Sequence, residues 1–204
     1  MFEIILSSPC GSGQTFAIEL LQSSFGHIPC TAGGHERKDI LGNDLRVVIL
    51  RNPYDAIASG AERYMDTSNH KGLLEEEKLN ISDIDGIRFQ ISRGEEKRYF
   101  EFFKDIENLK NIKILSFELL TKDPKKFIDE VGKFFKHAPL PNEKEKNNIF
   151  KKLAESGYAN RIPREKNDSR IVIDNLVLEM YPKETWRCWE IYSNLKAKLD
   201  LEGL

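Results

Sequence analysis

The sequence predicts an α/β protein in which a small central parallel sheet is flanked by helices on both faces. Three short apolar runs, at residues 2–6, 46–50 and 112–117, have the length and composition of buried strands. A segment with apolar residues at helical spacing follows each run. Strands that alternate with helices form parallel sheets, so we expect a three-layer, single-domain architecture over residues 1–204.

Helix starts and ends can be predicted for several segments. The second strand leads into Asn52, a good N-cap, and Pro53, which suits the first helical position. Asp123 and Pro124 open another helix in the same way after the third strand. Further helical patterns cover about 84–93, 95–108, 143–155 and 183–199. We expect residues 157–170, which carry several arginines and lysines and little periodicity, to form a basic loop.

Composition excludes several classes of partner. The net charge is −2, so neither nucleic acid nor an anionic membrane surface is expected to bind. No run approaches the roughly 18 apolar residues that a membrane span needs. Cys10, Cys30 and Cys188 are odd in number and far apart. They predict free thiols in a cytoplasmic protein, not a disulfide framework or a zinc site.

Residues 8–15 follow the first strand and have the character of a phosphate-binding loop. A small-residue loop between a strand and a helix directs backbone N–H groups and the positive end of the helix toward an anion. The segment has the frame of a Walker A loop, G-x-x-x-x-G-K-S/T, but Ser8 replaces the first glycine and Gln14 replaces the lysine. We therefore expect a phosphate loop that differs from that of ordinary ATPases.

Arg51 ends the second predicted strand, where nucleoside-triphosphate hydrolases usually have a carboxylate for magnesium. A cation at this position favours a second anionic group and no metal ion. Ser59 lies eight residues further on, and it can share an anion with Arg51 only if the intervening loop folds back. The alternative is that Arg51 pairs with Asp55 or caps a helix, while Ser59 packs on the sheet.

Residues 12–16, S-G-Q-T-F, and 51–59, R-N-P-Y-D-A-I-A-S, together resemble two motifs of the sulfotransferase family. Members of this family transfer a sulfuryl group from 3′-phosphoadenosine 5′-phosphosulfate (PAPS). The second motif reads R-N/D-P-x-D-x-x-x-S, and this chain matches every fixed position. Residues 115–124 are similar to a further family segment, Y-E-D-L…D-P. In the family, the helix after this segment ends in F-L or F-F, and Phe134 and Phe135 stand at that position here. The resemblance covers most of residues 1–136, and residues of about 137–204 match weakly.

The resemblance implies a P-loop-like fold with PAPS as co-substrate and no metal. It implies that Arg51 and Ser59 bind the 3′-phosphate. The first motif, P-K/R-S-G-T-T-W in the family, wraps the 5′-phosphosulfate, and Phe16 stands for an aromatic residue that can stack on adenine. The residues implied at the 5′ end are Gly11, Ser12, Gly13, Gln14, Thr15 and Phe16.

The chain departs from the family pattern at Gly11, where the family has a lysine or arginine, and at Gln14, which replaces a threonine. In the family, this cation should stabilise the negative charge on the leaving phosphate, a contribution of roughly 3–4 kcal/mol that the loop of this chain lacks. Three interpretations follow: Arg37, Lys38 or the loop at 161–170 supplies a cation, activity is low, or the protein only binds its nucleotide.

Transfer to a hydroxyl also needs a base. Family members often carry a K-x-H turn between the two motifs, and His35 falls in that interval, so the resemblance implies His35 as the base. The alternatives are an exposed histidine without a catalytic role, and Glu36 as the base. Residues 65–95, where the family varies its acceptor walls, are polar here. They favour a polar acceptor such as a sugar or peptide hydroxyl.

The sequence therefore leaves three alternative functions open. The first is a PAPS-dependent sulfotransferase. The second is a non-catalytic protein that binds adenosine 3′,5′-bisphosphate (PAP) or a related nucleotide. The third is a P-loop kinase that uses ATP and magnesium, against which both Gln14 and Arg51 argue.

Overall fold

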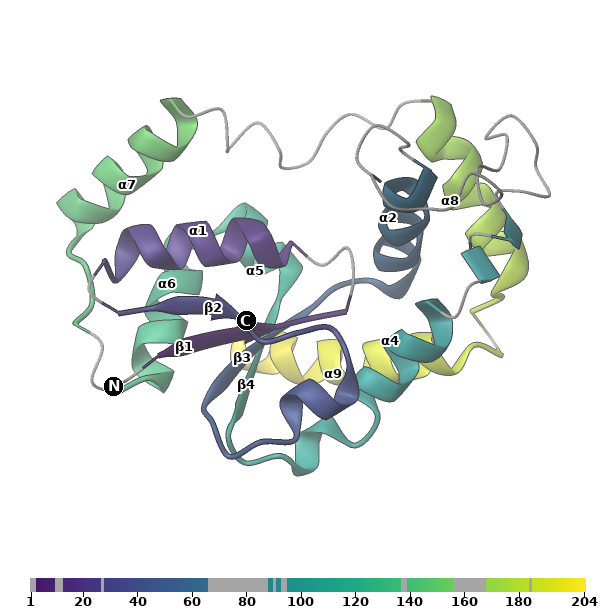
Figure 1. Cartoon of the computed structure of the whole chain (residues 1–204), viewed down its shortest axis with the longest axis horizontal. Coiled ribbons are helices and arrows are strands. Elements are labelled where there is room, and N and C mark those ends of the chain that lie inside the picture. Colours follow the sequence, from purple (N-terminus) through teal and green to yellow (C-terminus); the bar gives the residue numbers. More distant parts are fainter. Residues whose placement is uncertain are drawn as a thin grey trace.

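A computed structural model describes residues 3–9, 13–26, 28–65, 88–89, 91–92, 95–136, 139–155, 168–183 and 185–204. These residues form an α/β fold with a four-stranded, all-parallel sheet and eight α-helices (Figure 1). The strand order is β2-β1-β3-β4. The strands are β1 (Ile4–Ser7), β2 (Cys30–Ala32), β3 (Arg46–Leu50) and β4 (Ile112–Ser116).

The three predicted strands are confirmed, and β2 is an addition. Residues 47–50 of β3 are all completely buried, as expected for a strand covered on both faces. β2 escapes a pattern-based prediction because it has only three residues, two of which are exposed. It pairs with β1 in parallel, with Leu6 opposite Ala32.

The predicted helices that lie in the described residues are present, but the one expected at 95–108 ends at Phe103, the one expected at 183–199 runs from Arg187 to Glu202, and a helix at Asp168–Met180 is an addition. Asn52 and Asp123 cap α2 and α6, in each case with Pro at the next residue: Asn52 Oδ1 accepts from the Tyr54 amide at 2.9 Å, and Asp123 Oδ1 accepts from the Lys126 amide at 3.1 Å. The predicted helix at 84–93 lies mostly outside the described residues. The helices are α1 (Gln14–Ser24), α2 (Pro53–Met65), α4 (Glu95–Phe103), α5 (Phe117–Lys122), α6 (Pro124–Phe134), α7 (Glu143–Glu155), α8 (Asp168–Met180) and α9 (Arg187–Glu202), with short 3-10 helices η1 (Arg37–Ile40) and η3 (Ile106–Asn108).

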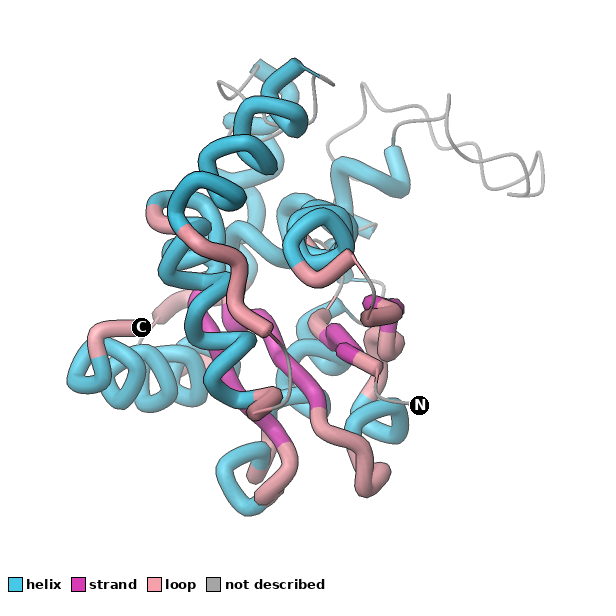
Figure 2. Tube along the Cα trace, turned by 90° about the vertical axis from the view of Figure 1, so that its left-hand side faces the viewer, coloured by secondary structure: helices cyan, strands magenta, loops and turns pink. Residues whose placement is uncertain are grey.

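Helices cover both faces of the sheet. α1 packs on β1 and β2 and touches α6, whereas α9 packs on β4 and touches α4. Figure 2 shows the strands as the inner layer with helices to either side. α8 lies against α2, at the end of the molecule where β3 leads into α2 (Figure 1).

The chain changes direction across the sheet between β1 and β3. It runs from β1 outward to β2 and then returns to pair β3 with the other side of β1, with Ser7 opposite Val48. Ligands of open α/β sheets bind beyond the carboxyl ends of the strands at such a switch point. The switch point lies between the two strands whose following turns the sequence singled out.

Two further observations concern the described residues only. None of their helices has the length and apolar character to span a bilayer. Cys30 and Cys188 are both free and buried, as predicted, and burial raises the pKa of Cys30 to about 11 and that of Cys188 to about 12. Cys10 lies outside the described residues.

Candidate functional site

Two buried hydroxyl groups lie at the last residue of β1 and at the first residue of the loop that follows it. Ser7 and Ser8 are completely buried, and neither side-chain oxygen has a hydrogen-bond partner among the residues that the structure describes. Buried hydroxyls in native proteins usually have a partner, which makes the Ser8 hydroxyl a candidate donor to a bound oxyanion. The Ser7 hydroxyl lies instead against Gly33, just after β2. Cys10, Gly11 and Ser12 lie outside the described residues, and the loop is described again from Gly13.

The first residues of α1 serve different purposes. Gln14 is 7% exposed, and its Nε2 donates to the Leu6 carbonyl at 2.6 Å, which fastens the start of α1 to β1. That amide N–H is therefore already engaged with the strand. Thr15 is exposed, and Phe16 is half-buried and packed against the core.

The ring of Phe117, the first residue of α5, connects the loop with Arg51. A Cβ added to Gly13 would lie 2.6 Å from Phe117 Cε2, so the loop backbone passes directly against the ring. The Cζ atom of Arg51 lies 4.4 Å from the centre of the same ring, in a cation–π contact. The turns after β1 and β3 therefore meet at one side chain, and the guanidinium of Arg51 lies close to the backbone of the loop after β1.

Gly13 is required here for two physical reasons, which gives a stability prediction. Its φ of +76° is in the left-handed region, and a Cβ would collide with Phe117. We expect Gly13→Ala to lower the free energy of unfolding by about 2 kcal/mol, and Gly26→Ala, whose added Cβ meets nothing closer than 4.0 Å, to change it little. Thermal unfolding of both variants checks this, and equal stability of the two would contradict the described loop geometry.

Arg51 is held at the carboxyl end of β3 by its backbone and its ring contact. Its carbonyl accepts a hydrogen bond from the Tyr99 hydroxyl of α4 at 2.7 Å. Burial lowers the pKa of the Arg51 guanidinium. Asp55 opposes that shift, and the positive charge of Arg170 adds to it. Two guanidinium groups therefore lie close enough to influence each other at this end of the sheet.

Ser59 is bound by a cation, but the cation is not Arg51. Arg170 Nη1 donates to Ser59 Oγ at 2.9 Å, and Arg170 Nη2 donates to the Asp55 carbonyl at 3.2 Å. Arg170 Nε also donates to Asp174 Oδ1 at 2.8 Å. Arg170 is only 8% exposed, so α8 delivers a fixed guanidinium to the hydroxyl that the sequence singled out.

The placement of Arg170 corrects the prediction for the basic loop. Residues 157–167 lie outside the described residues, but α8 already begins at Asp168, so the predicted loop is wrong at its end. The β-branched run from Ile171 to Ile173 obscures the helical pattern. Ile173 and Val177, four residues apart, are nonetheless buried, and α8 packs on α2. The Arg170–Asp174 spacing was a signal that the sequence did contain.

His35 directly contacts the loop after β1. Its Nδ1 lies 2.7 Å from the Ser8 carbonyl oxygen, which can only accept, so the contact requires a proton on Nδ1. In the neutral ring Nε2 is then the acceptor, as a base requires. Glu36, the alternative base, is paired with Lys38 at 2.7 Å. The other three histidines, His27, His70 and His137, lie outside the described residues.

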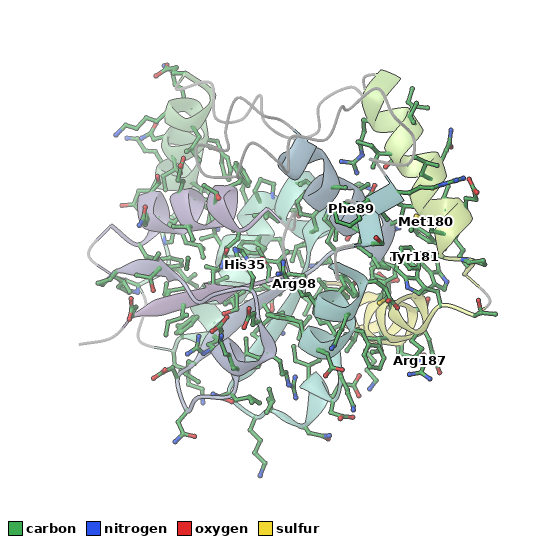
Figure 3. The ribbon with its side chains drawn as sticks, turned by 45° about the vertical axis from the view of Figure 1, so that its right-hand side comes forward. His35, Phe89, Arg98, Met180, Tyr181 and Arg187 are labelled. Carbon is green, nitrogen blue, oxygen red and sulfur yellow. The ribbon has the colours of Figure 1, made fainter. Side chains whose placement is uncertain are left out.

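The cations suggested as substitutes for the missing loop lysine differ in position. Arg37 Nη1 donates to the Phe102 carbonyl on α4 at 3.2 Å, and Lys38 is occupied by Glu36 at the surface. Figure 3 labels Arg98 on α4 and His35 in the segment before η1, and α4 contacts η1. Arg98 is a cation on α4 that sequence analysis did not single out.

Comparison with known proteins adds no assignment. No protein-family model matches the sequence, and a search of curated proteins finds no match. The functional argument therefore depends on the geometry of the switch point.

Proposed function

We propose that this protein is a PAPS-dependent sulfotransferase of P-loop-like fold. The observation that carries the proposal is the meeting of Gly13 and Arg51 at the ring of Phe117, next to the switch point between β1 and β3. An adenosine phosphorylated at both ends needs two anion sites separated by a nucleoside. The turns after β1 and β3 supply one such site each.

The two ends of the site have different chemistry. At the 5′ end, the backbone N–H groups of the loop and of α1 favour an anion, together with the buried Ser8 hydroxyl. At the 3′ end, Arg51, Ser59 and Arg170 offer two guanidinium groups and one hydroxyl. Planar guanidinium groups bind phosphate through paired hydrogen bonds, which makes this end the stronger anion site.

The proposed reaction assigns a proton to His35. An acceptor hydroxyl attacks the sulfur, and the bond from sulfur to the 5′-phosphate oxygen breaks. His35 Nε2 takes the hydroxyl proton, while the Ser8 carbonyl holds Nδ1 and fixes the ring orientation. The acceptor is a hydroxyl or amine of a polar small molecule, sugar or peptide. Figure 3 shows Phe89, Met180 and Tyr181 near one another at the end of α8, where one wall of an acceptor site can form.

A second candidate, a protein that binds PAP without catalysis, is favoured by one observation. Gly11 stands where the family has its loop cation, and the Arg37 guanidinium and the Lys38 amine both contact other groups. Such a protein keeps the 3′ site but lacks the charge that stabilises the leaving phosphate. Radiolabelled PAPS with a pooled acceptor library distinguishes the two: transfer of label supports the enzyme, and binding without transfer supports the second candidate.

Ligand-induced thermal stabilisation tests both candidates against an ATP-dependent kinase. At about one hundred times its Kd, PAP should add about 2.7 kcal/mol to the free energy of unfolding. For a chain of this size, that corresponds to an increase in Tm of about 5 °C or more. A chelator should leave the increase unchanged, and ATP with magnesium should give a smaller one. No response to PAP, or a magnesium-dependent response to ATP alone, contradicts the proposal.

A further inference from the structure

The carboxylate of Asp55 is in an unusual position for a side chain in a proposed anion site. Asp55 lies in the first turn of α2, and its Oδ1 is 3.7 Å from Arg170 Nη2. Its negative charge also acts on Arg51, whose pKa it raises against the effect of burial. One carboxylate therefore lies near Arg170 and acts electrostatically on Arg51, the two guanidinium groups that would receive the 3′-phosphate.

The two aspartates around Arg170 are held differently. Asp174 makes a 2.8 Å hydrogen bond to Nε, and its side chain is 15% exposed. The Asp55 carboxylate is beyond hydrogen-bond distance from Nη2, and its side chain is 41% exposed. Asp174 therefore fixes the orientation of Arg170, while Asp55 is free to turn toward solvent.

The charges around the site explain why such a carboxylate is useful. Burial and the positive charge of Arg170 both disfavour the charged form of Arg51. Asp174 and Glu118 also favour the charged form of Arg51. Asp55 compensates the two guanidinium groups from the side that is open to solvent.

We infer that the Asp55 carboxylate balances the two guanidinium charges when no ligand is bound. The 3′-phosphate must displace this carboxylate to bind between Arg51 and Arg170. This inference rests on the proposed function. A phosphate dianion gains more from two guanidinium groups than a carboxylate does, whereas a ligand without a 3′-phosphate has no reason to displace Asp55. The need to displace Asp55 thus favours the binding of nucleotides with a 3′-phosphate over the binding of nucleotides without one.

The test compares Asp55→Asn with the wild type by calorimetric titration of PAP and of adenosine 5′-monophosphate at low salt. Loss of one negative charge beside a dianion should tighten PAP binding roughly fivefold to tenfold and leave adenosine 5′-monophosphate unchanged. Glu179→Gln on α8, which removes the same charge from an ion pair with Arg88, should affect neither ligand. Asp174→Ala should weaken PAP binding, because Arg170 Nε loses the acceptor that fixes its orientation.

The outcomes separate this inference from the proposed function. If the wild type binds PAP and Asp55→Asn binds it equally or more weakly, the role of Asp55 is wrong and the proposed function stands. Equal tightening of both ligands also overturns the inference, because Asp55 then acts on the whole nucleotide. A wild type that does not bind PAP overturns the proposed function, and the inference with it.

Discussion

Arg51→Ala should abolish high-affinity binding of PAP. The guanidinium stacks on Phe117 next to the loop backbone, so its removal takes away charge-assisted hydrogen bonds in a largely buried setting. The loss of one partner from such a contact typically costs 2–5 kcal/mol, so we expect affinity to fall by roughly thirtyfold to several thousandfold. Calorimetric titration of PAP measures the effect.

Two further variants separate binding from folding. Arg51→Lys keeps the charge but loses the planar, two-pronged geometry, so it should bind PAP with intermediate affinity. Arg88→Ala removes an exposed guanidinium that pairs with Glu179 and should bind PAP as the wild type does. Circular dichroism and thermal unfolding show whether each variant is folded. A folded Arg51→Ala variant with unchanged affinity means that the second anion site is elsewhere.

His35→Ala should abolish turnover while PAP affinity changes less than about twofold. A general base contributes about 10²–10⁴-fold to rate, and His35 lies at the edge of the loop with Nε2 as its acceptor. Transfer from radiolabelled PAPS, with an acceptor found in a pooled library, measures turnover. Calorimetric titration of PAP on the same preparation measures affinity.

His35→Asn decides whether the histidine is a base or only supports the loop. The asparagine amide can replace Nδ1 as a donor to the Ser8 carbonyl, but it has no group in the place of Nε2. If His35 is the base, this variant should be as inactive as His35→Ala. Near wild-type turnover of His35→Asn would mean that His35 acts through the loop backbone and that another group removes the proton.

Strands and helix starts with strong local signals were predictable from the sequence. β3 combines a β-branched run with burial on both faces, and α2 begins with a side-chain cap followed by Pro53. Both signals depend on neighbours in the chain, so they can be identified without tertiary information. α8 was missed because its helical state depends on packing against α2, which the local β-branched run does not reveal.

In the candidate site, too, some features were predictable from the sequence and others were not. Arg51, Ser59 and His35 were identified from motif spacing, but their partners were not. The contact from Arg170 to Ser59 joins residues 111 positions apart, and that from His35 to Ser8 joins residues 27 positions apart. Spacing in a motif constrains residues along one element, whereas contacts between elements depend on how the helices pack on the sheet.

The sequence by itself determined the α/β class, a loop of small residues after the first strand and an arginine after Leu50, because those features are local patterns of side-chain size, branching and capping. Only the tertiary structure decided that the two turns meet, because the meeting requires β1 and β3 to be neighbours and Phe117 to reach both of them. It also decided that Ser59 is bound by Arg170, since that contact exists only when α8 packs against α2.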